Sequence, residues 1–324
     1  MKTTKKIYGI ALALTCSLAA TLKAQNIYVA NGGNGTIGEY GLDGSTINSS
    51  LISGLDVPAG VAISGNVVFV ANESGGTIGE YTLSGQTINA DLISGLVRPW
   101  GVAIVGNDLL VDNDPADGEG YIGEYTTSGQ TVNVSLISGS MITPRDVAIS
   151  GNDLFVVNAP TPNTAYISEY TTSGATVNAS LISGLNSPSG IAISGNDLFI
   201  VNNNGTVGEY TTSGATVNAS LITGLGDLAD IAISGNDLFV DNSDSVGEYT
   251  TSGATVNASL ITGLYNPVGI AFAVPEPGSL ALAGMGAAAL LSRRRLSSLR
   301  TPRKKITQHE STEENLFYPF GASV

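Results

Sequence analysis

Residues 188–225 read PSGIAISGNDLFIVNNNGTVGEYTTSGATVNASLITGL, and most of the remaining chain repeats this segment with variations. Four runs within it are rich in β-branched and apolar residues, and turn residues separate them; the runs lie at 190–194, 197–202, 206–211 and 215–222. Glycine and asparagine accept positive φ angles at little cost, so the four runs are predicted to be consecutive antiparallel strands, A to D. A helical repeat would need apolar residues three and four apart and few glycines, so it is disfavoured.

The tripeptide Gly-Glu-Tyr marks the copies of this segment. It ends at Tyr40, Tyr81, Tyr125, Tyr210 and Tyr249, and Ser168-Glu169-Tyr170 is an altered sixth copy. Consecutive tyrosines are 41, 44, 45, 40 and 39 residues apart. A period near 40 with four strands in each copy predicts an all-β fold, a six-bladed β-propeller.

The copies are offset from the two ends of the chain. Residues 26–31 match strand B of the repeat, whereas residues 267–273 match strand A and no strand B follows them. We therefore expect one blade to be assembled from both termini, with the last strand pairing with the first and closing the ring. The propeller is predicted to occupy residues 25–273.

The N-terminal segment, residues 1–24, has the features of a secretory signal peptide. Three lysines precede an apolar run from 7 to 20, and Leu22-Lys23-Ala24 offers a cleavage site. The competing interpretation is a lipoprotein anchor at Cys16, the only cysteine, although the preceding residues fit a lipobox poorly. If the signal peptide is removed, Cys16 is removed with it, and the exported propeller then contains no cysteine and no disulfide.

Charge is distributed unevenly along the chain. Of the 324 residues 42% are hydrophobic and 12% are charged, which is too apolar for a disordered chain. Residues 25–274 contain 23 Asp and Glu against two cations, Arg98 and Arg145, so this part carries 23 minus 2, or 21, net negative charges. Such a domain repels phosphates, and nucleic acid is therefore excluded as a partner.

Three motifs recur across residues 26–273: Pro-x-Gly-[Val/Ile]-Ala-Ile, Asn-Asp-Leu-Phe-Val-x-Asn and Val-Gly-Glu-Tyr. Together they resemble the NHL-type six-bladed β-propellers. The resemblance implies the fold and leaves the activity open, because this architecture serves many functions. The connections from strand D to A and from B to C differ between copies, so we expect a binding surface on the face that they form.

The C-terminal segment, residues 274–295, has three parts. A Pro-Glu-Pro tripeptide precedes an apolar run from 279 to 291, and three arginines follow it. These residues are Pro275, Glu276, Pro277, Arg293, Arg294 and Arg295. In this order they resemble the PEP-CTERM sorting signal. The resemblance implies export, processing by an exosortase and delivery to the surface or extracellular matrix of a Gram-negative bacterium that makes exopolysaccharide.

The apolar run of this segment is expected to form a transmembrane helix, with the arginines on the cytoplasmic side. It is short for a bilayer core, which suits a transient anchor in the inner membrane. Chains with this signal usually end soon after the arginines, whereas 29 residues follow here, at 296–324. They show no periodicity, and we expect a disordered tail.

Candidate ligand-binding residues lie on the variable face. Arg98, Trp100 and Arg145 are predicted to stack on a sugar or to hydrogen-bond to it. Asp146 and Asp230 replace the usual glycine at the start of strand A, near the axis. These five residues form the predicted ligand face, for a polysaccharide or a surface protein.

An acidic loop offers oxygen ligands of the kind that calcium prefers. It contains Asp112, Asp114, Asp117 and Glu119. Its spacing departs from an EF-hand, and a solvated acidic turn is the alternative. Calcium is the only cofactor that the sequence suggests.

Catalytic groups are scarce in the predicted propeller. The only histidine, His309, lies in the tail, so a Ser-His-Asp triad is excluded. We therefore predict an exported, non-catalytic binding or structural protein. The alternative is a metal-dependent hydrolase resembling the gluconolactonase branch of six-bladed propellers, with Asp146 and Asp230 among the candidate ligands. A purely structural propeller without a ligand is a third possibility.

Overall fold

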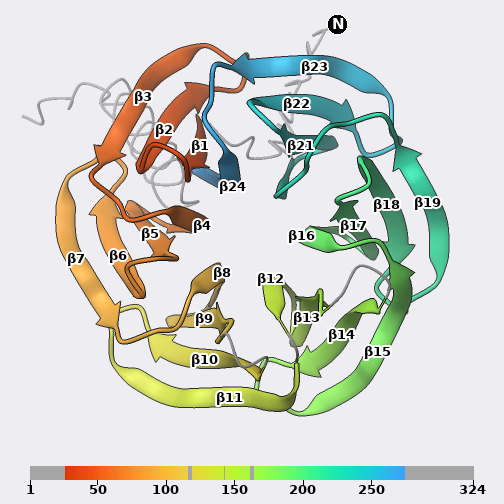
Figure 1. Cartoon of the computed structure of the whole chain (residues 1–324), viewed down its shortest axis with the longest axis horizontal. Helices are drawn as coiled ribbons and strands as arrows, with labels where there is room; N and C mark the ends of the chain where they lie inside the picture. The colour runs from red at the N-terminus through yellow and green to blue at the C-terminus, as the bar shows by residue number, and fades with distance from the viewer. Residues whose placement is uncertain (1–25, 116–118, 142, 161–163, 274–324) are drawn as a thin grey trace, which may run out of the picture. The chain divides into compact units, whose positions relative to one another are not determined.

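The computed structural model describes residues 26–115, 119–141, 143–160 and 164–273. Within these ranges the chain forms 24 strands and no helix, and the strands make six four-stranded antiparallel sheets. Figure 1 shows the sheets arranged as blades around a central axis. The predicted six-bladed, all-β propeller is thus confirmed.

Strands A to D of each blade follow the chain order, except in the first blade. The first blade contains β24 (Pro267–Ala273), β1 (Asn26–Asn31), β2 (Thr36–Gly41) and β3 (Thr46–Ser53). The second contains β4 (Pro58–Ser64), β5 (Val67–Asn72), β6 (Thr77–Thr82) and β7 (Thr87–Ser94). The third contains β8 (Pro99–Val105), β9 (Asp108–Asn113), β10 (Gly120–Thr126) and β11 (Thr131–Met141).

The other three blades repeat this arrangement. The fourth contains β12 (Pro144–Ser150), β13 (Asp153–Asn158), β14 (Ala165–Thr171) and β15 (Thr176–Leu185). The fifth contains β16 (Pro188–Ser194), β17 (Asp197–Asn202), β18 (Thr206–Thr211) and β19 (Thr216–Ile222). The sixth contains β20 (Ile231–Ser234), β21 (Asp237–Asn242), β22 (Ser245–Thr250) and β23 (Thr255–Thr262).

The ring closes in the first blade, as predicted. Strand β24 pairs antiparallel with β1, with Asn26 opposite Ala273 and Val29 opposite Ile270. A bulge ends the ladder near Asn31. The two ends of the ring therefore share one sheet, and no edge of an inner strand is left open at the seam.

The Gly-Glu-Tyr motif reflects packing within strand C. In blade five, a β-carbon at Gly208 would come within 2.8 Å of the ring of Tyr210, so the tyrosine lies over the glycine two residues before it. Tyr210 is 6% exposed, and its counterparts are also buried. Period-two alternation places both residues on the same face of the blade, which explains why a small residue precedes each tyrosine.

Neighbouring blades meet at the turns between strands C and D. In blade five, Gly214 has a φ of +86°, and a β-carbon there would lie 2.7 Å from the carbonyl oxygen of Leu181 in the preceding blade. The same close approach recurs in every blade, for example at Gly253 against Leu221. Glycine is therefore required both for the backbone conformation and for the contact.

This contact gives a stability prediction. Replacing Gly214→Ala is expected to lower the free energy of unfolding more than Gly195→Ala, whose φ of +62° is also left-handed but whose added methyl meets nothing within 4 Å. In Gly195→Ala, which serves as the control, the positive φ alone should lower the free energy of unfolding by roughly 1 kcal/mol. Gly214→Ala should exceed it by at least about 1 kcal/mol, because the main chain of Leu181 must move. Urea unfolding of both variants measures the difference, and equal costs would contradict the interblade contact.

The outermost strand of each blade is exposed along its first half. In Figure 1 these strands follow the circumference of the ring, and we call them the outer belt; they are β3, β7, β11, β15, β19 and β23. The first five residues of each are exposed, as in the stretch 255–259. Seven of the nine large apolar side chains exposed among the described residues lie here, including Val256 at 54%.

Three predicted segments lie outside the described residues: the signal peptide, the C-terminal hydrophobic helix and the tail after 295. The described part of the chain contains no helix long and apolar enough to cross a membrane.

Candidate functional site: the axial depression

The variable face carries a depression that five blades line together. One part has a volume of about 330 Å³, and its wall includes Trp100, Arg145, Ser189, Asn203, Asp227 and Asn266. An adjoining part of about 280 Å³ shares Arg145, Ser189 and Asn203 and reaches Pro160. Because these residues come from the starts of strands A and from the loops beside them, the depression lies at the mouth of the central axis.

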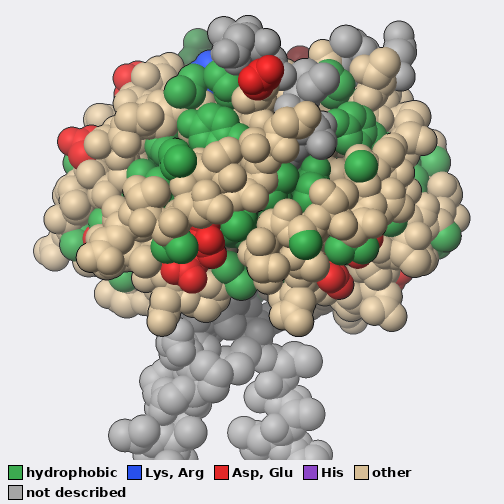
Figure 2. Space-filling view, turned by 90° about the horizontal axis from the view of Figure 1, so that it is seen from below, with side chains coloured by type: hydrophobic (Ala, Val, Ile, Leu, Met, Phe, Trp, Pro, Cys, Tyr) green, Lys and Arg blue, Asp and Glu red, His purple; other side chains and the backbone are tan. Residues whose placement is uncertain are grey.

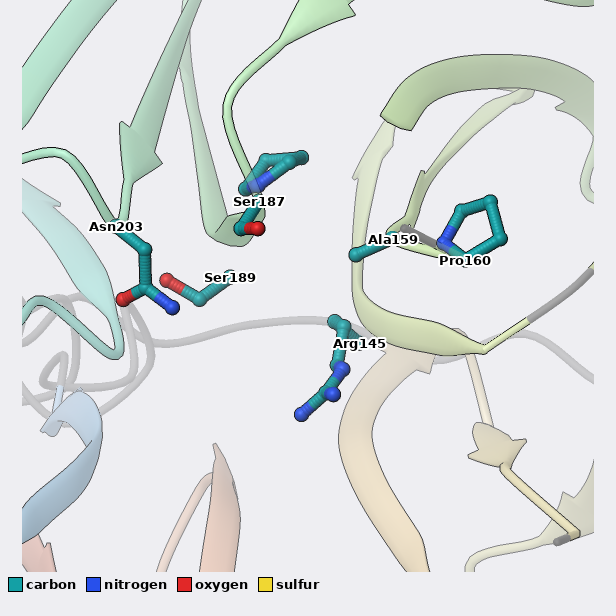
Figure 3. A pocket seen from close by; sticks show the side chains of 7 residues that line it. Arg145, Ala159, Pro160, Ser187, Ser189 and Asn203 are labelled. Atoms are coloured by element: carbon teal, nitrogen blue, oxygen red, sulfur yellow. The ribbon is translucent and has the colours of Figure 1, made fainter. Parts of the chain in front are cut away.

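Arg145 and Trp100 are in contact in the wall of this depression. The Cζ atom of Arg145 lies 5.4 Å from the centroid of the Trp100 ring, which is the geometry of a cation–π contact. Figure 3 shows the side chains of Arg145, Ser189 and Asn203 extending into the same space. The pair combines a flat apolar surface with hydrogen-bond donors.

The two cations of the propeller have different surroundings. Arg98 donates to Glu73 Oε1 at 3.0 Å and to Asp114 Oδ2 at 3.3 Å, so its charge is compensated. No described carboxylate lies within ion-pair distance of Arg145. Of the two arginines assigned to the ligand face, Arg145 is therefore the one without an ion pair among the described residues, although its charge opposes the upward pKa shifts of Asp112 and Asp114.

Asp146 and Asp230 lie near the axis and are half-buried, and their carboxylates accept hydrogen bonds between blades. Asp146 Oδ2 accepts from the backbone N–H of Ile191 in the next blade at 2.8 Å. Asp230 Oδ2 accepts from that of Ile270 at 2.7 Å. The other oxygen of each aspartate accepts from the following residue of its own chain segment. These aspartates connect blade four to five and blade six to one, and they support the depression from below.

Two further buried aspartates position the strands that carry the site. Asp112 Oδ1 accepts from the backbone N–H groups of Trp100 and Gly101 at 2.7 and 2.8 Å, which fixes the start of β8 under the indole. Asp241 does the same in blade six, accepting from Ala229 and Asp230 at 2.6 and 2.7 Å. The Oδ2 atom of each is buried and has no partner among the described residues.

Sequence reasoning did not single out Asp241. It occupies the repeat position of Asp112, next to the asparagine that ends strand B, where the other copies carry alanine or valine. A charged residue at a position that is otherwise apolar was the available signal.

All four aspartates have pKa values above the usual value for this side chain. Burial raises the pKa of Asp112 to about 8 and that of Asp230 to about 6, against the opposing effect of the backbone N–H donors. Burial, and then the neighbouring charge of Asp230, raises the pKa of both Asp146 and Asp241. The carboxylates of Asp112 and Asp146 lie close together, since a β-carbon added at Gly101 would be 2.8 Å from Asp112 Oδ2 and 3.1 Å from Asp146 Oδ1.

The predicted calcium loop is not brought together as a described ligand set. Asp112 points inward to its own blade, and Asp114 is paired with Arg98. Glu119 is exposed, and Asp117 lies outside the described residues. Nowhere in the described ranges do three or more His, Cys, Asp or Glu side chains form a group suited to a metal ion.

The asparagines that end the B strands are structural. They hydrogen-bond within their own blade and to the segment that enters it, as when Asn158 donates to Ser168 Oγ at 2.8 Å and Asn242 Oδ1 accepts from Gly226 at 2.7 Å. Such bonds tie the loop between strands B and C to the blade.

Comparison with known proteins supports the fold and the sorting signal. Residues 273–295 match the PEP-CTERM protein-sorting motif, which includes all six predicted sorting residues and lies outside the described residues from 274 onward. This motif implies export, exosortase processing and membrane-associated sorting toward the cell surface. No curated protein matches the chain in sequence.

Solved structures share the architecture. A chain of a nidogen–laminin complex superposes with a TM-score of 0.65 at 17% identity, covering 76% of this chain and 97% of that one. A gluconolactonase from Xanthomonas campestris superposes with a TM-score of 0.54 at 13% identity, covering 64% of this chain and 77% of that one. At such identities the likeness concerns the fold alone.

Proposed function

We propose that this chain is an exported cell-surface or extracellular-matrix protein that binds a polysaccharide through the axial depression without catalysing a reaction. The observation that carries the proposal is the contact between Arg145 and Trp100 in the wall of that depression. The apolar face of a sugar ring packs well on an indole, and the guanidinium donates several hydrogen bonds to hydroxyl or carboxylate oxygens. Ser189 and Asn203 add shorter polar groups at the same wall.

The location implied by the sorting motif agrees with such a ligand. A protein delivered to the surface of a Gram-negative cell that secretes exopolysaccharide meets polysaccharide at high local concentration. The propeller holds the depression on a rigid frame, so little ordering is required on binding. A surface protein is the other class of partner that the variable face could bind.

Binding can be tested with two depression variants and one matched control. Trp100→Ala and Arg145→Ala are each expected to weaken binding of the exported host polysaccharide at least about tenfold, which corresponds to about 1.4 kcal/mol. Arg98→Ala removes the same charge from the same face, but from an ion pair outside the depression, and should change affinity less than about threefold. Isothermal titration calorimetry measures all three.

The outcomes separate the proposals. Equal loss in Arg98→Ala and Arg145→Ala, with no loss in Trp100→Ala, would show that the charge of the face rather than the depression drives binding. Absence of any glycan binding by the wild-type chain, with calcium present, would reject the binding function and favour a purely structural propeller.

A metal-dependent lactonase-like hydrolase is the alternative. Asp146 and Asp230 would have to provide ligands at the axis, yet both oxygens of each already accept backbone N–H groups. The arrangement therefore supports binding better than hydrolysis. Lactone hydrolysis that disappears with a chelator and in Asp146→Ala would establish the enzyme instead.

A further inference from the structure

The outer belt carries a sequence pattern that the axial depression does not explain. Asn-x-Ser occurs at the same position in five of the six belt strands, with x not proline. The five asparagines are Asn48, Asn133, Asn178, Asn218 and Asn257. In β7 the pattern is broken, because Asn89 is followed two residues later by Asp91. Asn-x-Ser is the acceptor pattern for attachment of a glycan to the asparagine side chain.

The asparagine has one structural task that is common to all six strands. Its Oδ1 accepts the backbone N–H of the residue two positions later, at 3.1 Å in Asn257 and at 3.2 Å in Asn89. The register of the ladder shifts beside each of these asparagines, as between Glu248 and Tyr249 opposite Asn257. This local bond fixes the side chain and shapes the bulge.

The serine hydroxyl has no comparable task in the fold. Asp91 takes the place of the serine in β7, and the Asn89 turn is nevertheless the same. No described residue hydrogen-bonds to the hydroxyl of Ser259 or of its four counterparts. The fold therefore accounts for the asparagine and leaves the hydroxyl unexplained.

The side-chain amide is also accessible. Every asparagine and serine of the pattern is exposed, on the outermost strand of its sheet. Because Oδ1 is engaged with the local N–H, the amide Nδ2 is the end of the side chain that faces away from the turn.

We infer that the outer belt is a ring of N-glycosylation sites, occupied at the five Asn-x-Ser asparagines and not at Asn89. The donor would be a polyprenyl-diphosphate-linked oligosaccharide, met after export of the chain. In the transfer Nδ2 forms a bond to the anomeric carbon, the bond from that carbon to the diphosphate oxygen breaks, polyprenyl diphosphate leaves and the amide loses one proton.

Attached glycans would cover the part of the surface where apolar side chains and strand edges are exposed. Figure 2 views the ring from its side, where apolar side chains appear among polar ones. Val132, Val177, Val217 and Val256 precede four of the acceptors and are 53–54% exposed. Each belt strand is also the outer one of the two edge strands of its sheet. A bulky hydrophilic group at such an edge prevents pairing with another chain.

The test is peptide mapping by mass spectrometry of the full chain, purified from the cells that naturally make it. We expect a sugar mass on the peptides of the five acceptors and the unmodified mass for Asn89. The variant Asp91→Ser should gain a sixth modified site at Asn89, since it completes the pattern on an unchanged turn. Unmodified asparagines at all five positions in the exported protein would overturn the inference, as would equal modification of Asn89 in the wild type.

A second pair of variants separates loss of the acceptor pattern from loss of folding. Ser259→Ala keeps Asn257 and its turn and should abolish modification of Asn257 alone, whereas Ser259→Thr should retain it. The other four acceptors in the same molecule report whether the chain was exported and folded. Modification of Asn257 that persists in Ser259→Ala would contradict the assignment.

Discussion

A chain that ends at Asn266 is expected not to fold at 25 °C, whereas a chain that ends at Ala273 should give a stable propeller. The shorter chain lacks β24, so β1 loses its partner along the whole ladder from Asn26 to Asn31. It also loses the buried side chain of Ile270, which is 5% exposed and would contribute about 1.5–3 kcal/mol by itself. The backbone N–H that Asp230 accepts disappears as well, which leaves a buried carboxylate without its partner.

These losses together exceed about 5 kcal/mol, the lower end of the stability of ordinary domains. Far-ultraviolet circular dichroism and urea unfolding of the two chains provide the measurement. The longer chain is the matched control, since both lack everything after residue 273. A cooperative unfolding transition in the chain ending at Asn266, with the same midpoint as the control, would rule out the seam as a source of stability.

The stability of the propeller should fall as the pH rises from about 4 to about 8. The buried carboxyls have folded-state pKa values above their unfolded value of about 3.8, with Asp230 at about 6 and Asp112 at about 8. The native state therefore binds more protons than the unfolded chain in this window. Each such carboxyl contributes stability below pH 4 that is lost as the pH passes its folded pKa, at about 1.4 kcal/mol per pH unit.

The variant Asp112→Asn should flatten this dependence and be more stable than the wild type at pH 8. Its Oδ1 can still accept from Trp100 and Gly101, and an uncharged amide replaces the unpartnered Oδ2. The exposed Asp56 gives the control Asp56→Asn, which should leave the slope unchanged. Chemical denaturation between pH 4 and pH 8 measures the slopes. If the free energy of unfolding of the wild type instead increased steadily across this range, ionisation of these aspartates would not destabilise the folded state, and the prediction would be wrong.

Most of the fold could be predicted from the sequence because the repeat displays it six times. Each copy shows alternating apolar residues, turn residues at fixed offsets and one tyrosine marker. A strand that is hard to assign in one copy can therefore be assigned from the others. The seam could also be predicted, since residues 26–31 and 267–273 are the two parts of one copy.

The site was predictable only in part. Trp100 and Arg145 both line the depression from the starts of strands A, but their mutual contact depends on the rotation between blades, which the sequence does not encode locally. The burial of Asp146 was missed for the same reason. Its acceptor role needs the N–H of Ile191, which is 45 residues away. The pairing of Arg98 with Glu73 is a similar long-range contact.

The seam also determines how the ring responds to tension. Asn26 and Ala273 are opposite each other at one end of an antiparallel pair, so a pull applied between them acts across the strands and not along them. Hydrogen bonds loaded in this direction break one after another from that end, as in unzipping, and do not share the load as they would in shear. A force applied between these two residues would thus open the ring first at the first blade.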